Sequence, residues 1–83
     1  MPAPAYRTAI VTGASRGIGA ATVRRLRRLG LAVHAVARSG GALKALAEET
    51  GCVPLPIDIA DRAAVLAAFG AIEADVLVNN ASP

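Results

Sequence analysis

The segment TGASRGIG, residues 12–19, follows a short apolar run at residues 9–11 and opens a helical pattern that extends to Leu29. A strand, a glycine turn and a helix N-terminus in this order form a phosphate site, because the first helical N–H groups are unpaired and carry partial positive charge. We expect Gly13 to turn the chain off the strand, Gly17 to let the backbone approach a pyrophosphate, and Gly19 to bring the helix close to the sheet. The segment lacks the Gly-Lys-Ser/Thr ending of a P-loop, which argues against a nucleoside triphosphatase.

Two later motifs accompany the glycine segment in a fixed order. Asp58-Ile59 follows the third apolar run, and Asn79-Asn80-Ala81 ends the fourth. Together the three motifs resemble those of the short-chain dehydrogenase/reductase family, and the resemblance covers residues 7–83. It implies a Rossmann fold, a nicotinamide dinucleotide cofactor, and hydride transfer between that cofactor and a small carbonyl or alcohol substrate.

The length and composition of the chain exclude several classes of protein. Eighty-three residues, 54% of them hydrophobic, suffice for one small domain and argue against disorder. The apolar runs are too short to span a membrane, and the first residues lack the pattern of a signal peptide. Cys52 is the only cysteine and cannot form an internal disulfide. We therefore expect a cytoplasmic protein that has no membrane contact.

The formal net charge of +3 comes largely from four arginines in the first helix, Arg24, Arg25, Arg27 and Arg28. We interpret them as a solvated helix face that does not bind nucleic acid, because the chain has too few aromatic residues for base stacking. His34 lies within a predicted strand without a second metal ligand nearby, so we expect a structural histidine and no metal site.

The apolar pattern alternates between strands and helices along the whole chain. Strands are predicted at residues 8–12, 31–37, 52–57 and 76–78, with helices over about 16–29, 40–50 and 62–72. This β-α-β-α-β-α-β order predicts an α/β fold, the first half of a Rossmann-type doubly wound parallel sheet with strand order 3-2-1-4. Pro54 and Pro56 are two residues apart, so both missing N–H groups face one side, as an edge strand allows.

Periodicity and composition also predict which helical residues face the sheet and which residues cap the helices. We expect Gly30 and Gly51 to end the first and second helices. Ser39 and Asp61 are expected to cap the second and third helices at their N-termini. The predicted inward faces are Ile18, Thr22, Leu26 and Leu29 in the first helix, Leu43, Leu46 and Ala47 in the second, and Val65, Leu66, Phe69 and Ile72 in the third.

The end of the second strand indicates which dinucleotide is bound. A carboxylate there favours NAD, and a basic residue accepts the 2′-phosphate of NADP. This chain has Arg38 at that point, followed by Ser39, and Arg16 lies in the glycine turn. Arginine makes charge-assisted and often bidentate hydrogen bonds to phosphate, so we predict NADP(H). The alternative is that both are ordinary surface arginines.

The two later motifs supply further expected cofactor contacts. The resemblance implies that Asp58 accepts a hydrogen bond from the adenine amino group and that Ile59 lies against the ring, with a loop carboxylate as the alternative. Asn79 is expected to brace the sheet, while Asn80 and Ala81 lie along the cofactor. The predicted cofactor-binding residues are Gly13, Ser15, Arg16, Gly17, Ile18, Gly19, Arg38, Ser39, Asp58, Ile59, Asn80 and Ala81.

We assign no catalytic residue within these 83 residues. The resemblance implies a serine and a Tyr-x-x-x-Lys pair beyond residue 83, and Tyr6 and Lys44 do not have that spacing. We therefore expect an NADP-binding half-domain, residues 1–83, that is inactive alone and belongs to a dimeric or tetrameric reductase. The compact stretch from Gly51 to Asn80 is similar to the xylulose and dicarbonyl reductase branch.

Two alternatives remain open, namely a non-catalytic NADP-binding module and a structural fragment that pairs through the fourth strand. That strand leaves an apolar edge open at residues 76–78. A chain of this size buries only a modest fraction of its surface, so we expect marginal stability unless more polypeptide or a partner covers this edge.

Overall fold

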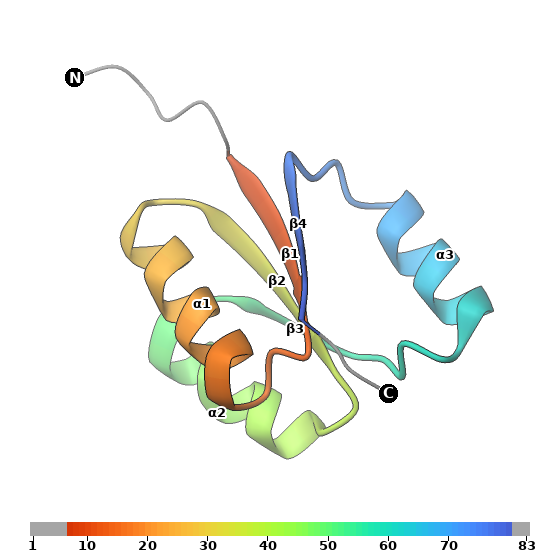
Figure 1. Cartoon of the computed structure of the whole chain (residues 1–83), viewed down its shortest axis with the longest axis horizontal. Helices are drawn as coiled ribbons and strands as arrows, with labels where there is room; N and C mark the ends of the chain where they lie inside the picture. Colours follow the sequence, from red (N-terminus) through yellow and green to blue (C-terminus); the bar gives the residue numbers. More distant parts are fainter. Residues whose placement is uncertain (1–6, 81–83) are drawn as a thin grey trace.

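A computed structural model describes residues 7–80 of the chain, which alternate between strands and helices (Figure 1). The elements are β1 (Thr8–Thr12), α1 (Gly17–Arg28), β2 (Ala32–Ala37), α2 (Gly40–Thr50), β3 (Val53–Pro56), α3 (Arg62–Gly70) and β4 (Val76–Asn79). Each predicted element is present, and its ends lie within about two residues of the predicted ones.

The four strands form one parallel sheet in the order β3-β2-β1-β4, which confirms the predicted topology. The register sets Ile10 of β1 between His34 of β2 and Leu77 of β4. β3 lies at one edge, as its two prolines predict, and β4 lies at the other. All four strands therefore end at the same edge of the sheet, where parallel α/β proteins bind ligands.

The core lies between the sheet and the helices α1 and α2, which cover one face of it (Figure 1). Val11 of β1 and Val33 of β2 are fully buried there against Val23 of α1 and Leu43 of α2. β2 consists almost entirely of valine and alanine, and β1 carries Ala9, Ile10 and Val11 between two threonines, as expected for strands that are covered on a face of a parallel sheet.

The prediction of the buried face of α1 is wrong, because the buried positions are displaced from the predicted ones by about one residue along the helix. Ile18 and Leu29 are 76% and 57% exposed, whereas Ala20 and Val23 are buried. α1 approaches the sheet through its small residues, and an apolar stripe defined only by large side chains misses that face. Leu26 borders both faces and is half-buried.

The prediction that α3 packs onto the sheet is also wrong. Leu66 is 70% exposed, and Val65, Phe69 and Ile72 are only half-buried. Within residues 7–80 no other element packs against α3, which stands away from the sheet on the face opposite α1 and α2 (Figure 1). Its apolar side chains are therefore only partly removed from water.

The helix ends follow the predicted caps, with one exception. Gly30 and Gly51 have positive φ angles of 90° and 78°, which suit glycine at a helix C-terminus. Asp61 accepts a hydrogen bond from the N–H of Ala64 at 3.2 Å. Ser39 occupies the N-cap position of α2, but its hydroxyl makes no capping hydrogen bond within the described part of the chain. The side chain of Ser39 is thereby left for other contacts.

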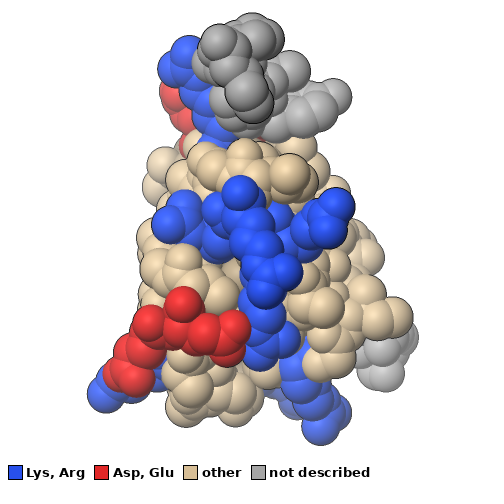
Figure 2. Space-filling view, turned by 90° about the vertical axis from the view of Figure 1, so that its left-hand side faces the viewer, with Lys and Arg blue, Asp and Glu red and all other residues tan. Residues whose placement is uncertain are grey.

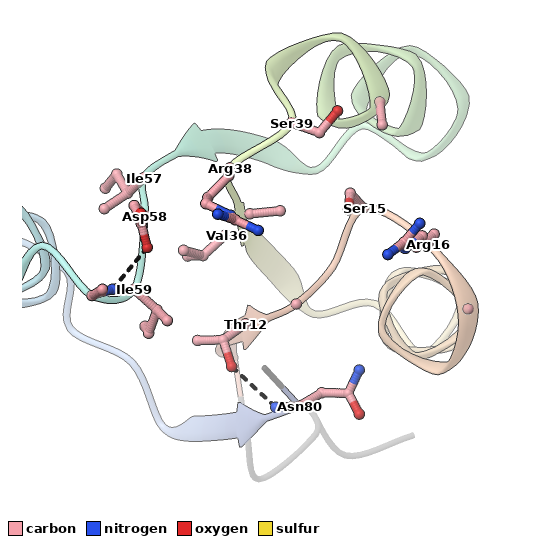
Figure 3. Close-up of a pocket in the computed structure, with 15 residues that line it drawn as sticks. Thr12, Ser15, Arg16, Val36, Arg38, Ser39, Ile57, Asp58, Ile59 and Asn80 are labelled. Atoms are coloured by element: carbon pink, nitrogen blue, oxygen red, sulfur yellow. Dashed lines mark hydrogen bonds between the residues drawn. The ribbon is translucent and has the colours of Figure 1, made fainter. Parts of the chain in front are cut away.

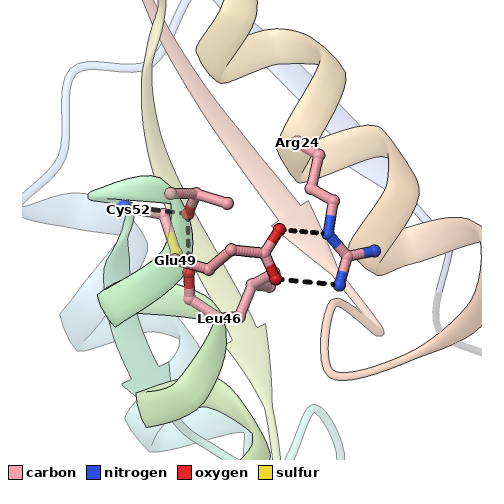
Figure 4. Close-up of polar contacts among 5 residues, drawn as sticks. Arg24, Leu46, Glu49 and Cys52 are labelled. Carbon is pink, nitrogen blue, oxygen red and sulfur yellow. Dashed lines mark hydrogen bonds and ion pairs between the residues drawn. The ribbon is translucent and has the colours of Figure 1, made fainter.

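Basic side chains gather on the face of the molecule that carries α1 and α2 (Figure 2). Arg24 forms a bidentate ion pair with Glu49 of α2 (Figure 4). The expectation that all four arginines lie on a solvated face is wrong for Arg27, which is half-buried and donates to the carbonyl oxygens of Thr50 at 2.9 Å and Leu31 at 2.8 Å. Arg27 therefore joins α1 to the C-terminal end of α2.

Within residues 7–80, no helix is both long enough and apolar enough to cross a membrane. His34 occupies a central position in β2, as predicted, and no cluster of three metal-ligating side chains occurs in that range.

The starts of β1 and β4 are joined by Asp75. Its carboxylate accepts hydrogen bonds from the N–H groups of Arg7 and Thr8, at 2.8 and 3.0 Å. The N–H of Asp75 in turn donates to the carbonyl oxygen of Thr8 at 2.9 Å. Because both N–H groups stabilise the ionised carboxylate, the pKa of Asp75 lies below its usual value of 3.8.

We predict that Asp75 makes the stability of the chain depend on pH. A carboxylate whose pKa is lower in the folded state contributes stability that is present above its unfolded pKa and is lost as the pH falls through its folded pKa. The free energy of unfolding should therefore decrease as the pH falls below about 4, and Asp75→Asn should flatten that decrease. Urea unfolding of the parent chain and of Asp75→Asn at a series of pH values measures this pH dependence.

Glu49→Gln is the matched control, because the pKa of Glu49 is also lowered, by its hydrogen bond to Arg24. This variant should keep the part of the pH dependence that Asp75 supplies. Identical pH profiles for Asp75→Asn and the parent chain would contradict the role of Asp75.

Candidate functional site

A cleft of about 910 Å³ opens at the carboxyl ends of the strands (Figure 3). Its walls come from the turn between β1 and α1, the loop between β2 and α2, the segment after β3, and Asn80 after β4. These segments are distant in sequence but adjacent in the sheet, because all four strands are parallel and end at one edge. The cleft is large enough for the adenosine half of a dinucleotide.

The glycine turn has the geometry that the sequence predicts. Gly13 and Gly17 both have a φ of 61°, in the left-handed region that favours glycine. Apart from its chain neighbours and the backbone of α1, no atom lies within 4 Å of the position that a Cβ on Gly17 would occupy, so the backbone at the mouth of the turn is open to a ligand. A Cβ on Gly19 would lie 2.0 Å from the carbonyl oxygen of Gly13, so only glycine lets α1 start this close to β1.

The N-terminus of α1 adjoins the cleft with free hydrogen-bond donors. Its first turn consists of Gly17, Ile18, Gly19 and Ala20 and contains no acidic side chain. Arg16 at the N-cap position has no side-chain oxygen with which to accept a hydrogen bond from these N–H groups. The N–H of Ala20 donates to the carbonyl oxygen of Arg16 at 3.3 Å, so the N–H groups of the three residues before it and the positive end of the helix dipole together favour an anion at this point.

Two cations and two hydroxyl groups line the cleft beside this helix end. Arg16 comes from the glycine turn and Arg38 from the end of β2, and both are exposed. Figure 3 shows Ser15 between the two arginines in this view, with Ser39 on the loop that follows Arg38. The cluster brings positive charge and hydroxyl donors together without a carboxylate at the end of β2.

The opposite wall of the cleft contains Ile57, Asp58 and Ile59 (Figure 3). Oδ1 of Asp58 accepts a hydrogen bond from the N–H of Ala60 at 2.9 Å, which holds the loop in a turn. The carboxylate of Asp58 therefore acts as a loop carboxylate, which is the alternative to adenine contact given above. Asp58 also lines the cleft. This wall offers apolar side chains and an acceptor group to a ligand.

The floor of the cleft depends on Thr12, the last residue of β1, which is 2% exposed. Its hydroxyl donates to Oδ1 of Asn79 at 2.9 Å and accepts from the N–H of Asn80 at 3.0 Å (Figure 3). Asn79 thus braces the sheet, as predicted, and Asn80 is held at the wall of the cleft.

We predict that Thr12→Val destabilises the fold by about 1–3 kcal/mol, because it removes the hydroxyl that pairs with the polar groups of Asn79 and Asn80 at almost constant volume. Thr22→Val is the control, since its hydroxyl bonds only the helical carbonyl oxygen of Ile18 at an exposed site. Urea unfolding of both variants measures the difference. Equal losses would contradict the role of Thr12.

The cleft contains most of the predicted site residues. Those that line it are Gly13, Ser15, Arg16, Gly17, Arg38, Ser39, Asp58, Ile59 and Asn80. Gly19 does not line the cleft but lets α1 approach the glycine turn closely. The side chain of Ile18 is exposed and does not line the cleft either. Ala81 lies outside the described residues. The prediction missed the lining residues Thr12, Val36, Ala37, Ala42, Ile57 and Ala60. Most of these adjoin a strand end or a predicted site residue, which is the signal that would have found them.

Comparisons with known proteins identify the family of the chain. The family model of short chain dehydrogenases matches residues 7–83. Carbonyl reductase [NADPH] 2 of Sus scrofa is 43% identical over 76 residues, which cover 89% of this chain and 31% of that protein. L-xylulose reductase of Homo sapiens is 41% identical over 80 residues, covering 94% and 33%. The chain therefore belongs to the short-chain dehydrogenase family.

Solved structures agree with this assignment. The crystal structure of BdcA in complex with NADPH matches with a TM-score of 0.85 and 40% identity, over 93% of this chain and 32% of that one. A metagenomic short-chain oxidoreductase in complex with NADP matches with a TM-score of 0.80 and 40% identity, over 93% and 39%. The chain spans about a third of the length of the curated relatives it matches.

Proposed function

We propose that residues 1–83 form the NADP(H)-binding part of an NADP(H)-dependent short-chain dehydrogenase/reductase. The observation that carries this proposal is that Arg16 and Arg38 line the same cleft, beside a helix N-terminus that no side chain caps. A site for NAD would place a carboxylate at the end of β2, where this chain has Arg38.

The residues of the cleft fit the parts of NADP(H). The N–H groups at the start of α1 would hold the pyrophosphate, and Gly17 leaves room for it. Arg16, Arg38 and the uncommitted hydroxyl of Ser39 would hold the 2′-phosphate. Asp58 and Ile59 would contact the adenine, with Asn80 and Ala81 along the remainder of the cofactor.

The cofactor, when bound, supplies the hydride that passes between it and a carbonyl or alcohol. The residues of this chain bind and orient it, and we assign none of them to proton transfer. Lys44 lies exposed on α2 and does not line the cleft. The catalytic serine, tyrosine and lysine would follow residue 83. Residues 1–83 alone would therefore be inactive.

A small carbonyl compound is the substrate class that the relatives support. Matches include proteins described as a carbonyl reductase, an L-xylulose reductase and, at 44% identity over 78 residues, the D-erythrulose reductase of Gallus gallus. We propose that the complete enzyme reduces a small carbonyl compound of this kind and assembles as a dimer or tetramer.

Titration of the chain with NADPH and with NADH, followed by the fluorescence of the reduced nicotinamide, tests cofactor choice. NADPH should bind more tightly, and Arg16→Gln should weaken NADPH binding about tenfold while changing NADH binding little, because one charge-assisted contact is lost. Lys44→Gln removes the same charge outside the cleft and should change neither affinity. Equal binding of the two dinucleotides by the parent chain would contradict the proposal.

A further inference from the structure

The two arginines that line the cleft differ from Arg24 and Arg27 in that no partner holds their side chains. Arg24 is paired with Glu49, and Arg27 donates to two backbone carbonyl oxygens. Arg16 and Arg38 are both exposed, and neither guanidinium group makes a hydrogen bond or an ion pair within residues 7–80. Because a free arginine side chain keeps its rotamers, each of the two can follow a phosphate group to more than one position.

The hydroxyl groups of Ser15 and Ser39 line the same part of the cleft as these arginines (Figure 3). Neither hydroxyl makes a hydrogen bond to another group in the described part of the chain. A hydroxyl group donates a hydrogen bond to a phosphate oxygen and accepts one from a free ribose hydroxyl. Ser15 and Ser39 therefore suit a ribose oxygen in both its phosphorylated and its free form.

No described residue of the cleft requires one particular ribose hydroxyl to be free. A carboxylate at the end of β2 would do so, because it accepts from a hydroxyl and repels a phosphate, but Arg38 occupies that point. Asp58 lies on the opposite wall, with Oδ1 bonded to the N–H of Ala60. A site rejects an analogue strongly where the wrong group leaves a buried polar partner unpaired, and Arg16 and Arg38 are exposed. The cleft should therefore distinguish a 2′-phosphate from a 3′-phosphate only weakly.

We propose that the cleft also binds adenosine 5′-diphosphates that carry a phosphate on the 3′-hydroxyl, the nucleotide of coenzyme A and its thioesters, in competition with NADP(H). This inference rests on the proposed function, because it assigns a second ligand to the cofactor site. The two nucleotides have the adenine, the ribose and the 5′-diphosphate in common. They differ in which of two neighbouring ribose carbons carries the third phosphate and in the group beyond the diphosphate.

Each shared part of the nucleotide has the same partners in both ligands. The N–H groups at the start of α1 hold the 5′-diphosphate, where Gly17 leaves room for it. Ile57 and Ile59 line the wall that faces the adenine. Figure 3 shows Arg16 and Arg38 on separate segments of the chain, so positive charge extends across the cleft. A phosphate moved from the 2′ to the 3′ oxygen stays within this charged region.

Binding of both nucleotides to one cleft gives the complete enzyme a form of regulation. Coenzyme A and its thioesters inhibit it competitively with NADP(H), because an occupied cleft excludes the second nucleotide. The inhibition grows with the ratio of the thioester to NADP(H) and disappears when NADP(H) is saturating. Reduction of the carbonyl substrate therefore slows when coenzyme A thioesters accumulate.

Calorimetric titration of the 83-residue chain with coenzyme A and with dephospho-coenzyme A tests this inference. The two ligands differ only in the 3′-phosphate, so the difference in their affinities measures the contact of that group. Coenzyme A should bind at least about tenfold more tightly, because its 3′-phosphate accepts charge-assisted hydrogen bonds. Saturating NADPH should prevent its binding. Equal affinities for the two ligands, or binding of coenzyme A that NADPH does not displace, would overturn the inference.

The variant Arg38→Gln tests whether the 3′-phosphate lies beside Arg38. It should weaken coenzyme A binding about tenfold and leave the affinity for dephospho-coenzyme A nearly unchanged, because only the phosphate contact is lost. Lys44→Gln removes the same charge from α2 outside the cleft and should change neither affinity. Both side chains are exposed, and circular dichroism checks that each variant keeps its fold. Parent-like binding of coenzyme A by Arg38→Gln would overturn the assignment of the phosphate to this cleft.

Titration of the same sample with NADPH separates a failure of this inference from a failure of the proposed function. A chain that binds NADPH but does not prefer coenzyme A to its dephospho form contradicts only the second ligand. A chain that binds neither NADPH nor coenzyme A contradicts both.

Discussion

Replacing Gly19 with alanine should destabilise the chain by about 3 kcal/mol or more and abolish cofactor binding. The added Cβ would lie 2.0 Å from the carbonyl oxygen and 2.8 Å from the carbonyl carbon of Gly13, and 3.0 Å from the Cα of Ala14. All three are backbone atoms, so the side-chain repacking that relieves many core substitutions is not possible here. The glycine turn must move, and the N–H groups at the start of α1 move with it.

Urea unfolding and NADPH titration of the same sample measure the two effects of Gly19→Ala. Gly41→Ala is the matched control, because Gly41 lies within α2 and no atom other than its chain neighbours and the backbone of α2 is found within 4 Å of its added Cβ. Alanine at that helical position should stabilise the chain by about 0.5–1 kcal/mol. A Gly19→Ala variant with the stability and affinity of the parent chain would show that the close approach of α1 to β1 is unimportant.

Replacing Arg38 with aspartate should reverse the preference for NADP over NAD. The parent side chain can donate two charge-assisted hydrogen bonds to the 2′-phosphate, each worth about 1.5–3 kcal/mol. Aspartate repels the phosphate and can accept hydrogen bonds from the free ribose hydroxyl groups of NAD. NADP affinity should fall by a factor of about 100 or more, while NAD affinity rises.

Calorimetric titration with both dinucleotides measures this reversal. Lys44→Glu changes the net charge of the chain by the same amount, on an exposed face of α2 outside the cleft, and should leave the preference for NADP intact. Unchanged NADP affinity in Arg38→Asp would mean that the 2′-phosphate lies elsewhere.

Features of the fold that depend on local sequence were predictable. The caps at Gly51 and Asp61 follow from the conformational freedom of glycine and from the side-chain oxygen of aspartate, and both are present. The two prolines of β3 placed that strand at an edge, because a missing N–H is tolerated only there. The alternation of strands and helices predicted a parallel sheet with right-handed connections, and the order 3-2-1-4 followed from the doubly wound Rossmann fold.

Features that depend on tertiary packing were not predictable from periodicity. The inward face of α1 consists of small residues such as Ala20, which carry little weight in an apolar stripe. The apolar residues along one side of α3 predict that this side packs against another element, but they do not identify that element. Asp75 and Arg7 are 68 residues apart in sequence and meet only because β1 and β4 are neighbours.

The candidate site was predictable where a residue type has a distinct chemistry. The glycines and arginines of the cleft were identified because phosphate binding requires open backbone and positive charge. Thr12 was missed because a threonine at the end of a strand is ordinary in β structure. Its role emerges only from its hydrogen bonds to Asn79 and Asn80 on β4 and just after it.

Nuclear magnetic resonance titration of the ¹⁵N-labelled chain with adenosine 2′,5′-bisphosphate tests most directly whether the cleft binds the phosphorylated adenosine of NADP(H). We predict saturable shifts at the amides of Gly17, Ile18 and Gly19 at the start of α1, and at Ser39 beside Arg38. Adenosine 5′-monophosphate, which lacks the 2′-phosphate, should bind more weakly. Shifts confined to the arginines at the far end of α1, or none at all, would contradict it.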